Sequence, residues 1–299
     1  MIENSQHSQA PVPSFLYGTA EKTDESLILA ALSAGYRALD CACQPGLYHE
    51  QVVGQAVATA LSPTSQGGLG LRRGQLFIQT KFTTPAGHQP GLAPYLEGDA
   101  PEVKVKKSLE MSMSKLQVDY IDSLLLHGPM PTLEETLEIW AGMESVFGSK
   151  VRQLGISNVS LEQLEAIYDR ATIKPSMVQN RFWRYNHFDS AVRSFCAEEK
   201  INYQAFWVLT GNPQLLDCSL VGWFAEKVGA SREDGLFNLV LSLGQDGSQV
   251  SVLNGTTNPA RMRRSLEIME KVGDLPDVLR QGFKDELDEL ANAVGQGTA

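Results

Sequence analysis

The stretch VRQLGISNVSLEQLEAI, residues 151–167, contains the pattern that sets the fold of this chain. Its first part, Val151–Ser157, is a short apolar run of the kind that forms a buried strand. Ser160 then begins SLEQ, and a serine followed three residues later by a glutamine is typical of a helix N-terminus. Leu164 and Ile167 continue with helical spacing. The stretch therefore predicts one strand followed directly by one helix.

The same alternation extends through the chain in both directions. Further helices are expected from Thr23 to near Gly35, after Thr132, which can cap a helix, and at Pro259, which suits a first helical turn. Runs with strand character lie at Phe15–Thr19, Tyr36–Cys41, Leu76–Phe82, Tyr120–His127, Val151–Ser157, Ser176–Asn180, Ile201–Leu209 and Gln249–Asn254. Strands that alternate with helices in this way predict a parallel sheet with crossover helices.

Eight such units in about 250 residues fit an α/β fold closed as a (β/α)8 TIM barrel. The alternative is an open, doubly wound sheet, which normally carries a G-x-G-x-x-G turn after its first strand. Here the first strand ends in YGTA, residues 17–20, and no such turn follows. The sequence therefore favours a single barrel domain over residues 1–299. Its core is expected at about 12–272 and a C-terminal helix at about 275–294.

Composition excludes several classes of partner. The formal net charge is −10, which argues against nonspecific binding to nucleic acid or to anionic membranes. The four cysteines lack the spacing of a zinc site, so we expect no metal and free thiols in a reducing compartment. The polar start of the chain and the absence of a long apolar run predict a cytoplasmic protein with no membrane span.

Polar side chains follow the predicted strands at the face where barrel active sites form. The second to sixth strands deliver, in order, Asp40, Lys81, His127, Ser157 with Asn158, and Gln179. Each has an ordinary alternative. Asp40 can cap the next helix, Lys81 can be a solvated strand end, and His127 can be a hydrogen-bonded core residue. Their joint occurrence favours a shared site, in which Asp40 supplies the counter-charge that a buried Lys81 needs.

These groups combine into a proton donor when Tyr48 is added. A phenol with a pKa of about 10 is a weak acid at neutral pH. A nearby ammonium such as Lys81 lowers that pKa. His127 can then orient a substrate oxygen by a hydrogen bond while Tyr48 gives that oxygen a proton.

At this point the chain resembles the aldo-keto reductase superfamily along nearly its whole length. The matching pieces are GYRALDCA at 35–42, LYHEQVVG at 47–54, IQTKF at 78–82, DYIDSLLLHGP at 119–129, KVRQLGISN at 150–158, MVQN at 177–180 and TTNPARMRRS at 256–265. The resemblance implies a (β/α)8 barrel that binds NADP(H) in extended form across the carboxyl face. It also implies a catalytic tetrad, matched here by Asp40, Tyr48, Lys81 and His127.

The resemblance further implies the contacts of the cofactor. Ser157, Asn158 and Gln179 match the residues that contact the nicotinamide carboxamide, and Phe206 matches an aromatic ring, usually tyrosine, that stacks on nicotinamide. The full set of cofactor-binding residues implied in this way is Gly18, Thr19, Asp40, Ser157, Asn158, Gln179, Phe206, Trp207, Leu209, Gly255, Thr256, Thr257, Arg261, Arg264 and Ser265. Of these, Thr256, Thr257 and Arg261 match the segment that grips the 2′-phosphate of the adenosine.

Two departures from the family pattern affect these assignments. Asp40 and Tyr48 are separated by eight residues where five is usual, which makes His49 a rival for the role of Tyr48. The surrounding CQPGLYHE resembles a branch common among fungal members. In the phosphate segment, Asn254–Gly255 stands where a lysine is common. Because Arg261, and Arg264 beside it, keep positive charge there, we expect NADPH rather than NADH.

The sequence therefore predicts an NADPH-dependent reductase of aldehydes or ketones, with Tyr48 as general acid and a small carbonyl compound as substrate. A monomer is expected, and the fungal resemblance suggests a role in secondary metabolism. Phe82, Trp207 and the Pro- and Gly-rich residues 83–99 are expected to form the walls of the substrate pocket. Two alternatives stay open: an NADPH-binding barrel that regulates a partner protein, and a reductase of activated C=C bonds or imines.

Overall fold

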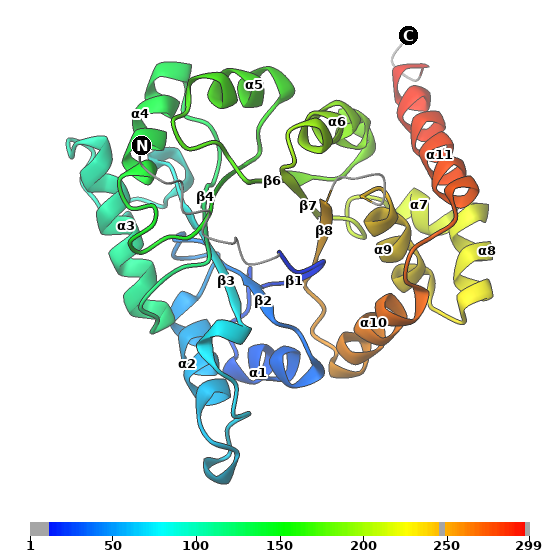
Figure 1. Cartoon of the computed structure of the whole chain (residues 1–299), viewed down its shortest axis with the longest axis horizontal. Coiled ribbons are helices and arrows are strands. Elements are labelled where there is room, and N and C mark those ends of the chain that lie inside the picture. The colour runs from blue at the N-terminus through cyan, green and yellow to red at the C-terminus, as the bar shows by residue number, and fades with distance from the viewer. Residues whose placement is uncertain (1–11, 245–248, 297–299) are drawn as a thin grey trace, which may run out of the picture.

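The computed structural model of the chain describes residues 12–244 and 249–296. Parallel strands close a barrel in sequence order from β1 to β8, with helices around it (Figure 1). The strands are β1 Phe15–Gly18, β2 Ala38–Asp40, β3 Phe77–Phe82, β4 Ser123–Leu126, β5 Leu154–Ser157, β6 Met177–Arg181, β7 Asn202–Phe206 and β8 Gln249–Asn254. Phe15 of β1 pairs with Val252 of β8, so the sheet has no open edge. The predicted (β/α)8 barrel is confirmed and the open sheet is excluded.

Helices fill the connections between strands. They are α1 Glu25–Ala34, α2 Glu50–Leu61, α3 Pro101–Leu116, α4 Leu133–Glu144, α5 Leu161–Arg170, α6 Ser190–Glu198, α7 Pro213–Asp217, α8 Ser219–Val228, α9 Arg232–Ser242, α10 Pro259–Val272 and α11 Asp277–Gln296, with 3-10 turns η1 Thr64–Gln66, η2 Arg73–Gln75, η3 Pro85–Gly87 and η4 Arg184–Asp189. Among the described residues, no helix is both long and apolar enough to cross a membrane.

Local signals set the starts of these helices. Thr132 and Glu135 form a reciprocal capping box at α4, and Ser160 forms one with Gln163 at α5. Pro259 occupies the first turn of α10, where its missing N–H costs nothing. The α1 helix is capped by Asp24, whose carboxylate accepts from the Ser26 N–H. These short-range bonds explain why the helix starts could be located from the sequence.

The connection between β7 and β8 differs from the others because its described part, up to residue 244, contains three helices, α7, α8 and α9. No helix was expected in this stretch from the sequence. The last of the three, α9, begins with Ser231 as its cap and packs against both α8 and β8. Its first turn therefore lies beside the carboxyl end of the barrel, where α9 contributes a wall of the site.

The barrel interior becomes polar toward the carboxyl ends of its strands. Gln79 of β3 and Gln204 of β7 exchange two amide hydrogen bonds across the barrel, at 2.8 and 3.1 Å. Both side chains are fully buried, so each must find its partners inside the protein. Gln79 also donates to Asp40 at 2.7 Å. This amide layer is the floor on which the site is built.

Residues 83–99 do not form the expected pocket wall. Tyr95 stacks on Phe82 with the ring centroids 5.4 Å apart, and its hydroxyl donates to the Thr83 carbonyl at 2.6 Å. Gln44 holds the Gly87 carbonyl at 2.6 Å. These contacts pack the loop against Phe82 of β3 and Gln44, and neither the loop nor the fully buried Phe82 lines the cleft described below. The expectation was wrong for both, because a non-local aromatic contact decides where the loop packs.

Candidate active site

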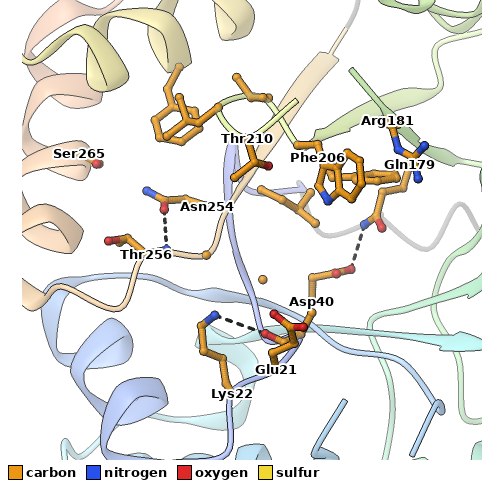
Figure 2. A pocket seen from close by; sticks show the side chains of 18 of the residues that line it. Glu21, Lys22, Asp40, Gln179, Arg181, Phe206, Thr210, Asn254, Thr256 and Ser265 are labelled. Atoms are coloured by element: carbon orange, nitrogen blue, oxygen red, sulfur yellow. Dashed lines mark hydrogen bonds between the residues drawn. The ribbon is translucent and has the colours of Figure 1, made fainter. Parts of the chain in front are cut away.

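A cleft of about 910 Å³ lies at the carboxyl ends of the strands (Figure 2). We call one half the barrel end, which comprises Asp40, Tyr48, His127, Ser157, Asn158, Gln179, Arg181 and Phe206. The other half, the helix end, lies between α9 and α10 and comprises Asp234, Thr256, Arg261, Arg264 and Ser265. Figure 2 shows Gln179 and Arg181 on the opposite side of the cleft from Ser265. The cleft is thus an elongated site with two chemically different halves.

A buried ion pair underlies the barrel end. Lys81 Nζ lies 2.8 Å from each carboxylate oxygen of Asp40 and also donates to the Cys41 carbonyl at 2.8 Å. The side chains of Lys81 and Asp40 are 1% and 2% exposed. Burial is the largest single influence and lowers the pKa of the Lys81 ammonium, but the charge and hydrogen bond of Asp40, with Tyr48 and Cys41, together outweigh it, so the pKa is raised. Lys81 is therefore a charged, fixed group and not a solvated strand end.

The amide layer completes the surroundings of Asp40. Oδ1 of Asp40 accepts from Gln79 at 2.7 Å in addition to Lys81. It also accepts from Gln179 at 2.9 Å, a bond that Figure 2 shows. Asp40 does not cap the following helix, whose cap position is taken by His49. Because its carboxylate is fully hydrogen-bonded, Asp40 has no freedom to leave Lys81.

Tyr48 is brought to this ion pair by the loop between β2 and α2. An isolated bridge joins Tyr48 to Ala20 beyond β1, and the Glu21 N–H donates to the Leu47 carbonyl at 2.7 Å. Lys81 Nζ lies 5.2 Å from the centre of the Tyr48 ring. His49, the rival residue, does not line the cleft. The longer spacing from Asp40 is absorbed by the loop, and Tyr48 still reaches the barrel end.

The pKa of Tyr48 differs from the sequence-based expectation. Burial raises the pKa of the phenol, and the Lys81 ammonium opposes burial without overcoming it, so the net direction is upward. The expected net lowering by Lys81 was therefore wrong for this form of the protein. The phenol keeps its proton through the neutral range, as a proton donor requires.

His127 lies against Tyr48 at the same end of the cleft. Their ring centroids are 6.1 Å apart in an edge-on arrangement, and His127 Nδ1 lies 2.9 Å from the Thr83 hydroxyl. Burial, the Lys81 ammonium and His88 together lower the pKa of His127 to about 3. The imidazole is therefore neutral at physiological pH, with one nitrogen held by Thr83.

A second group of polar residues borders the barrel end. The Ser157 hydroxyl donates to the Gln179 carbonyl at 2.6 Å, and the Asn158 amide donates to the His127 carbonyl at 2.8 Å. Asn158 adopts a left-handed backbone with φ 55°, which places its side chain at the rim of β5. Phe206 ends β7 in register with Arg181 of β6. All of these residues line the cleft.

The helix end is more open and is built around one carboxylate. Asp234 of α9 accepts from the Ser265 hydroxyl at 2.6 Å and from the Ser231 hydroxyl at 2.8 Å. Arg264 approaches the same carboxylate at 3.8 Å. Arg261, in the first turn of α10, is exposed and has no ion-pair partner among the described residues. Arg261 is therefore the free positive charge of this half.

Three of the residues implied by the family resemblance do not line the cleft. Thr19 is fully buried and its hydroxyl donates to the Asp40 carbonyl at 2.8 Å, so it supports β2 from behind. Lys81 lies beneath Asp40 and Tyr48 instead of in the cleft wall, and Thr257 also stays outside it. The remaining residues of that set, Gly18 to Ser265, do line the cleft.

Several cleft residues were absent from the sequence-based set. They are Ala20, Glu21, Lys22, Leu47, Arg181, Val208, Thr210, Ser231, Glu233, Asp234, Phe237, Leu253 and Asn254. A signal existed for Arg181, because it is two residues beyond Gln179 and alternate strand residues share a face. For Asp234 the S-x-x-D pattern with Ser231 marks a helix start, but its place in the cleft depends on the packing of α9, which the sequence does not show.

Comparisons with known proteins agree with this fold. A family model described as "Aldo/keto reductase family" matches residues 17–213. An aldo-keto reductase of Mycolicibacterium smegmatis is 27% identical over 287 residues, which cover 94% of this chain and 86% of that protein. A D-galacturonate reductase of Fragaria ananassa is 28% identical over 289 residues, covering 85% of this chain and 82% of that protein.

A solved structure supports the assignment of the barrel fold. An aldose reductase from Giardia lamblia matches with a TM-score of 0.73 at 22% identity, over 95% of this chain and 94% of that chain. The relatives named here come from a bacterium and a plant, and the expected fungal branch finds no support among them.

Proposed function

The chain belongs to the aldo/keto reductase family, and from this premise we propose that it is an NADPH-dependent reductase of small aldehydes or ketones with Tyr48 as the proton donor. Members of this family reduce carbonyl groups with a nicotinamide cofactor, so the chain is an oxidoreductase. The observation that carries the finer proposal is the convergence of Tyr48, His127 and the buried Lys81–Asp40 pair at one end of the cleft.

The residues of the cleft fit a nicotinamide dinucleotide. Its volume of about 910 Å³ is at the upper end of ligand pockets, which are usually about 300–1,000 Å³. Amide and hydroxyl groups of Ser157, Asn158 and Gln179 suit a carboxamide at the barrel end. The free guanidinium of Arg261 suits a phosphate at the helix end. When bound in this orientation, the cofactor supplies the hydride that the carbonyl carbon accepts.

Tyr48 completes the reduction by giving its proton to the carbonyl oxygen. In the proposed step the oxygen gains the phenolic proton while the carbonyl carbon gains the hydride, so the product is an alcohol and Tyr48 is left as a phenolate. Lys81 stabilises that phenolate, because its ammonium is fixed near the ring and cannot be neutralised by burial. Asp40 keeps Lys81 charged and in place.

His127 orients the substrate oxygen in this proposal, and Thr83 sets the position of the proton on its ring. A neutral imidazole carries one N–H. Among the described residues the Thr83 hydroxyl has no other side-chain hydrogen-bond partner than His127 Nδ1, so we assign Thr83 as donor to that nitrogen. The ring proton then belongs to Nε2, where it can donate to the carbonyl oxygen.

The direct test is cofactor oxidation by the purified chain. We expect steady loss of NADPH absorbance with a panel of aldehydes and ketones, and alcohols as the products. Tight binding of NADPH without oxidation by any compound would contradict the proposal and support a regulatory barrel. A saturated carbonyl product from an unsaturated aldehyde would instead assign the chain to C=C reduction.

A further inference from the structure

Arg181 is a cleft residue to which the proposed reaction gives no role. It ends β6 in register with Phe206 of β7, two residues beyond Gln179. Side chains two apart on a strand share a face, so Arg181 stands one layer above Gln179 toward the mouth of the cleft. Asn180, between them, points the other way and donates to Asp189 at 2.7 Å. Figure 2 shows Arg181 at the barrel end, far from Ser265.

Aromatic rings hold the Arg181 guanidinium. Its Cζ lies 4.1 Å from the ring centre of Trp207, 4.9 Å from that of Trp183 and 5.9 Å from that of Phe206. An aromatic face attracts a guanidinium that stacks on it. The N–H groups lie in the plane of the guanidinium and point away from the ring, so stacking gives them no hydrogen-bond acceptor. The stacked arrangement therefore fixes the orientation of a donor fork without using the donors.

No acidic residue neutralises this cation. Among the described residues Arg181 has no ion pair, and its buried Nε has no hydrogen-bond partner. By contrast, Arg73 is paired with Asp122 at 2.7 Å, and Arg264 faces Asp234. A half-buried guanidinium without a counter-charge is unusual in a chain with a net charge of −10. The free donors of Arg181 therefore point to an anionic ligand.

The backbone at Trp207 holds its ring in place beside Arg181. The backbone of Trp207 has φ 60°, a left-handed conformation that is rare for a bulky residue. Its carbonyl accepts from the Gly211 N–H at 2.9 Å, which fixes the turn after β7. The indole is 49% exposed, although an apolar ring of this size normally packs inward. The strained turn keeps the ring stacked on Arg181 at the mouth of the barrel end.

We infer that Arg181 is a specificity residue that binds a carboxylate of the substrate, so that the preferred substrates are aldehydes or ketones carrying a carboxylate group. The inference rests on the proposed function and extends it. A planar carboxylate matches the two parallel donors of a guanidinium fork. We assign the anion to the substrate because Arg181 lies across the cleft from Ser265 of α10 (Figure 2). Arg261, which is assigned to a cofactor phosphate, lies one turn before Ser265 on the same helix.

A matched pair of substrates tests the inference. The probes are 4-carboxybenzaldehyde and its methyl ester, which share a shape but differ in charge. For the unmodified chain we expect a lower KM for the acid. Arg181→Met, which keeps length but removes charge, is expected to raise the KM of the acid about ten- to hundredfold, the usual weight of a charge-assisted bond. The KM of the ester and the Kd of NADPH are expected to change less than about threefold.

Two further variants exclude a structural explanation. Arg181→Lys keeps the charge without the fork and is expected to recover part of the preference for the acid. Arg184→Met serves as the control, because Arg184 is a neighbouring arginine that contacts Tyr185 and does not line the cleft. It should leave the preference unchanged. The inference is overturned if Arg181→Met raises the KM of the acid and of the ester equally. It is also overturned if the unmodified chain has the same KM for both compounds.

A binding measurement separates this inference from the proposed function. Benzoate cannot be reduced, and its binding next to Trp183 and Trp207 should change tryptophan fluorescence in the presence of NADP⁺. We expect a saturable change with benzoate, a much weaker one with benzamide, and loss of the difference in Arg181→Met. This result would hold even if no aldehyde were turned over. Loss of NADPH affinity in Arg181→Met, with benzoate binding intact, would assign the arginine to the cofactor and overturn the inference.

Discussion

The two halves of the cleft differ in how far their charged side chains are buried and how closely these are paired. At the barrel end, the Lys81 and Asp40 side chains are 1% and 2% exposed and meet at 2.8 Å. At the helix end, Arg264 is 54% exposed and lies 3.8 Å from Asp234. Charges in a buried site interact strongly and cannot move, whereas exposed charges are screened by water. The difference is consistent with the proposal that the barrel end carries the chemistry and the helix end binds the cofactor phosphate.

The largest predicted effect is at the barrel end. Tyr48→Phe removes only the phenolic hydroxyl and with it the proton to be donated, so turnover is expected to fall about 10²–10⁴-fold, the usual contribution of a positioned general acid. The Kd of NADPH should stay within about twofold, because most residues proposed to contact the cofactor lie elsewhere in the cleft. Stopped-flow kinetics and fluorescence titration measure the two quantities. Tyr185→Phe, at an exposed tyrosine, is the control, and unchanged turnover in Tyr48→Phe would contradict the assigned donor.

Breaking the ion pair between Lys81 and Asp40 tests how much this pair contributes to the stability of the folded chain. Lys81→Met leaves Asp40 charged and buried, which is expected to cost about 3–5 kcal/mol in the free energy of unfolding. Adding Asp40→Asn removes the unpaired charge and should recover part of that loss. Lys106→Met, at an exposed pair with Glu102, should cost less than about 1 kcal/mol. Urea denaturation distinguishes these outcomes, and equal losses at both pairs would remove the contrast between buried and exposed charges.

The helix end is tested by its free cation. Arg261→Ala is expected to weaken NADPH binding about ten- to hundredfold, since it removes a charge-assisted contact to phosphate. NADH, which lacks that phosphate, should bind as before, and turnover at saturating NADPH should change little. Arg263→Ala is a matched control, because Arg263 lies on the same helix but does not line the cleft. A similar loss for both cofactors would show that Arg261 has no phosphate-specific role.

The pH dependence of the free energy of unfolding should show whether His127 is neutral in the folded chain. Its folded pKa of about 3 lies below the unfolded value of about 6.5. Between these values the unfolded chain binds a proton that the folded chain does not, so stability falls as the pH falls. His127→Gln should therefore lose about 2 kcal/mol less than the unmodified chain between pH 6.5 and pH 5. Parallel pH dependences for both chains would contradict a buried neutral histidine.

The smallest expected effect concerns the orientation of that same ring. Thr83→Val keeps the shape of the side chain but removes the hydrogen bond to Nδ1, and we expect about a tenfold loss of kcat with little change in KM. Thr83→Ser should restore most of the activity. Nitrogen NMR of His127 should show the Nε2–H tautomer in the unmodified chain and a mixture in Thr83→Val. An unaltered tautomer would leave Thr83 without a positioning role.

Much of the fold and part of the site follow from the sequence because their causes are local. Apolar runs locate the strands, and capping boxes such as that of Thr132 locate helix starts. Residues at strand ends, such as Asp40 and Gln179, meet because barrel geometry brings strand ends together. The S-x-x-D pattern of Ser231 and Asp234 marks the start of α9, but no sequence pattern shows that the packing of α9 brings Asp234 into the site. The packing of residues 83–99 includes the stacking of Tyr95 on Phe82, which the spacing of the sequence does not predict.

The orientation of the dinucleotide is the claim on which all roles in the cleft depend. A crystal structure with NADP⁺ tests it most directly. We predict the nicotinamide at the barrel end, with its carboxamide against Ser157, Asn158 and Gln179 and its ring on Phe206, and the 2′-phosphate on Arg261. A nicotinamide bound at the helix end, or one too far from Tyr48 for a shared carbonyl group, would contradict the account.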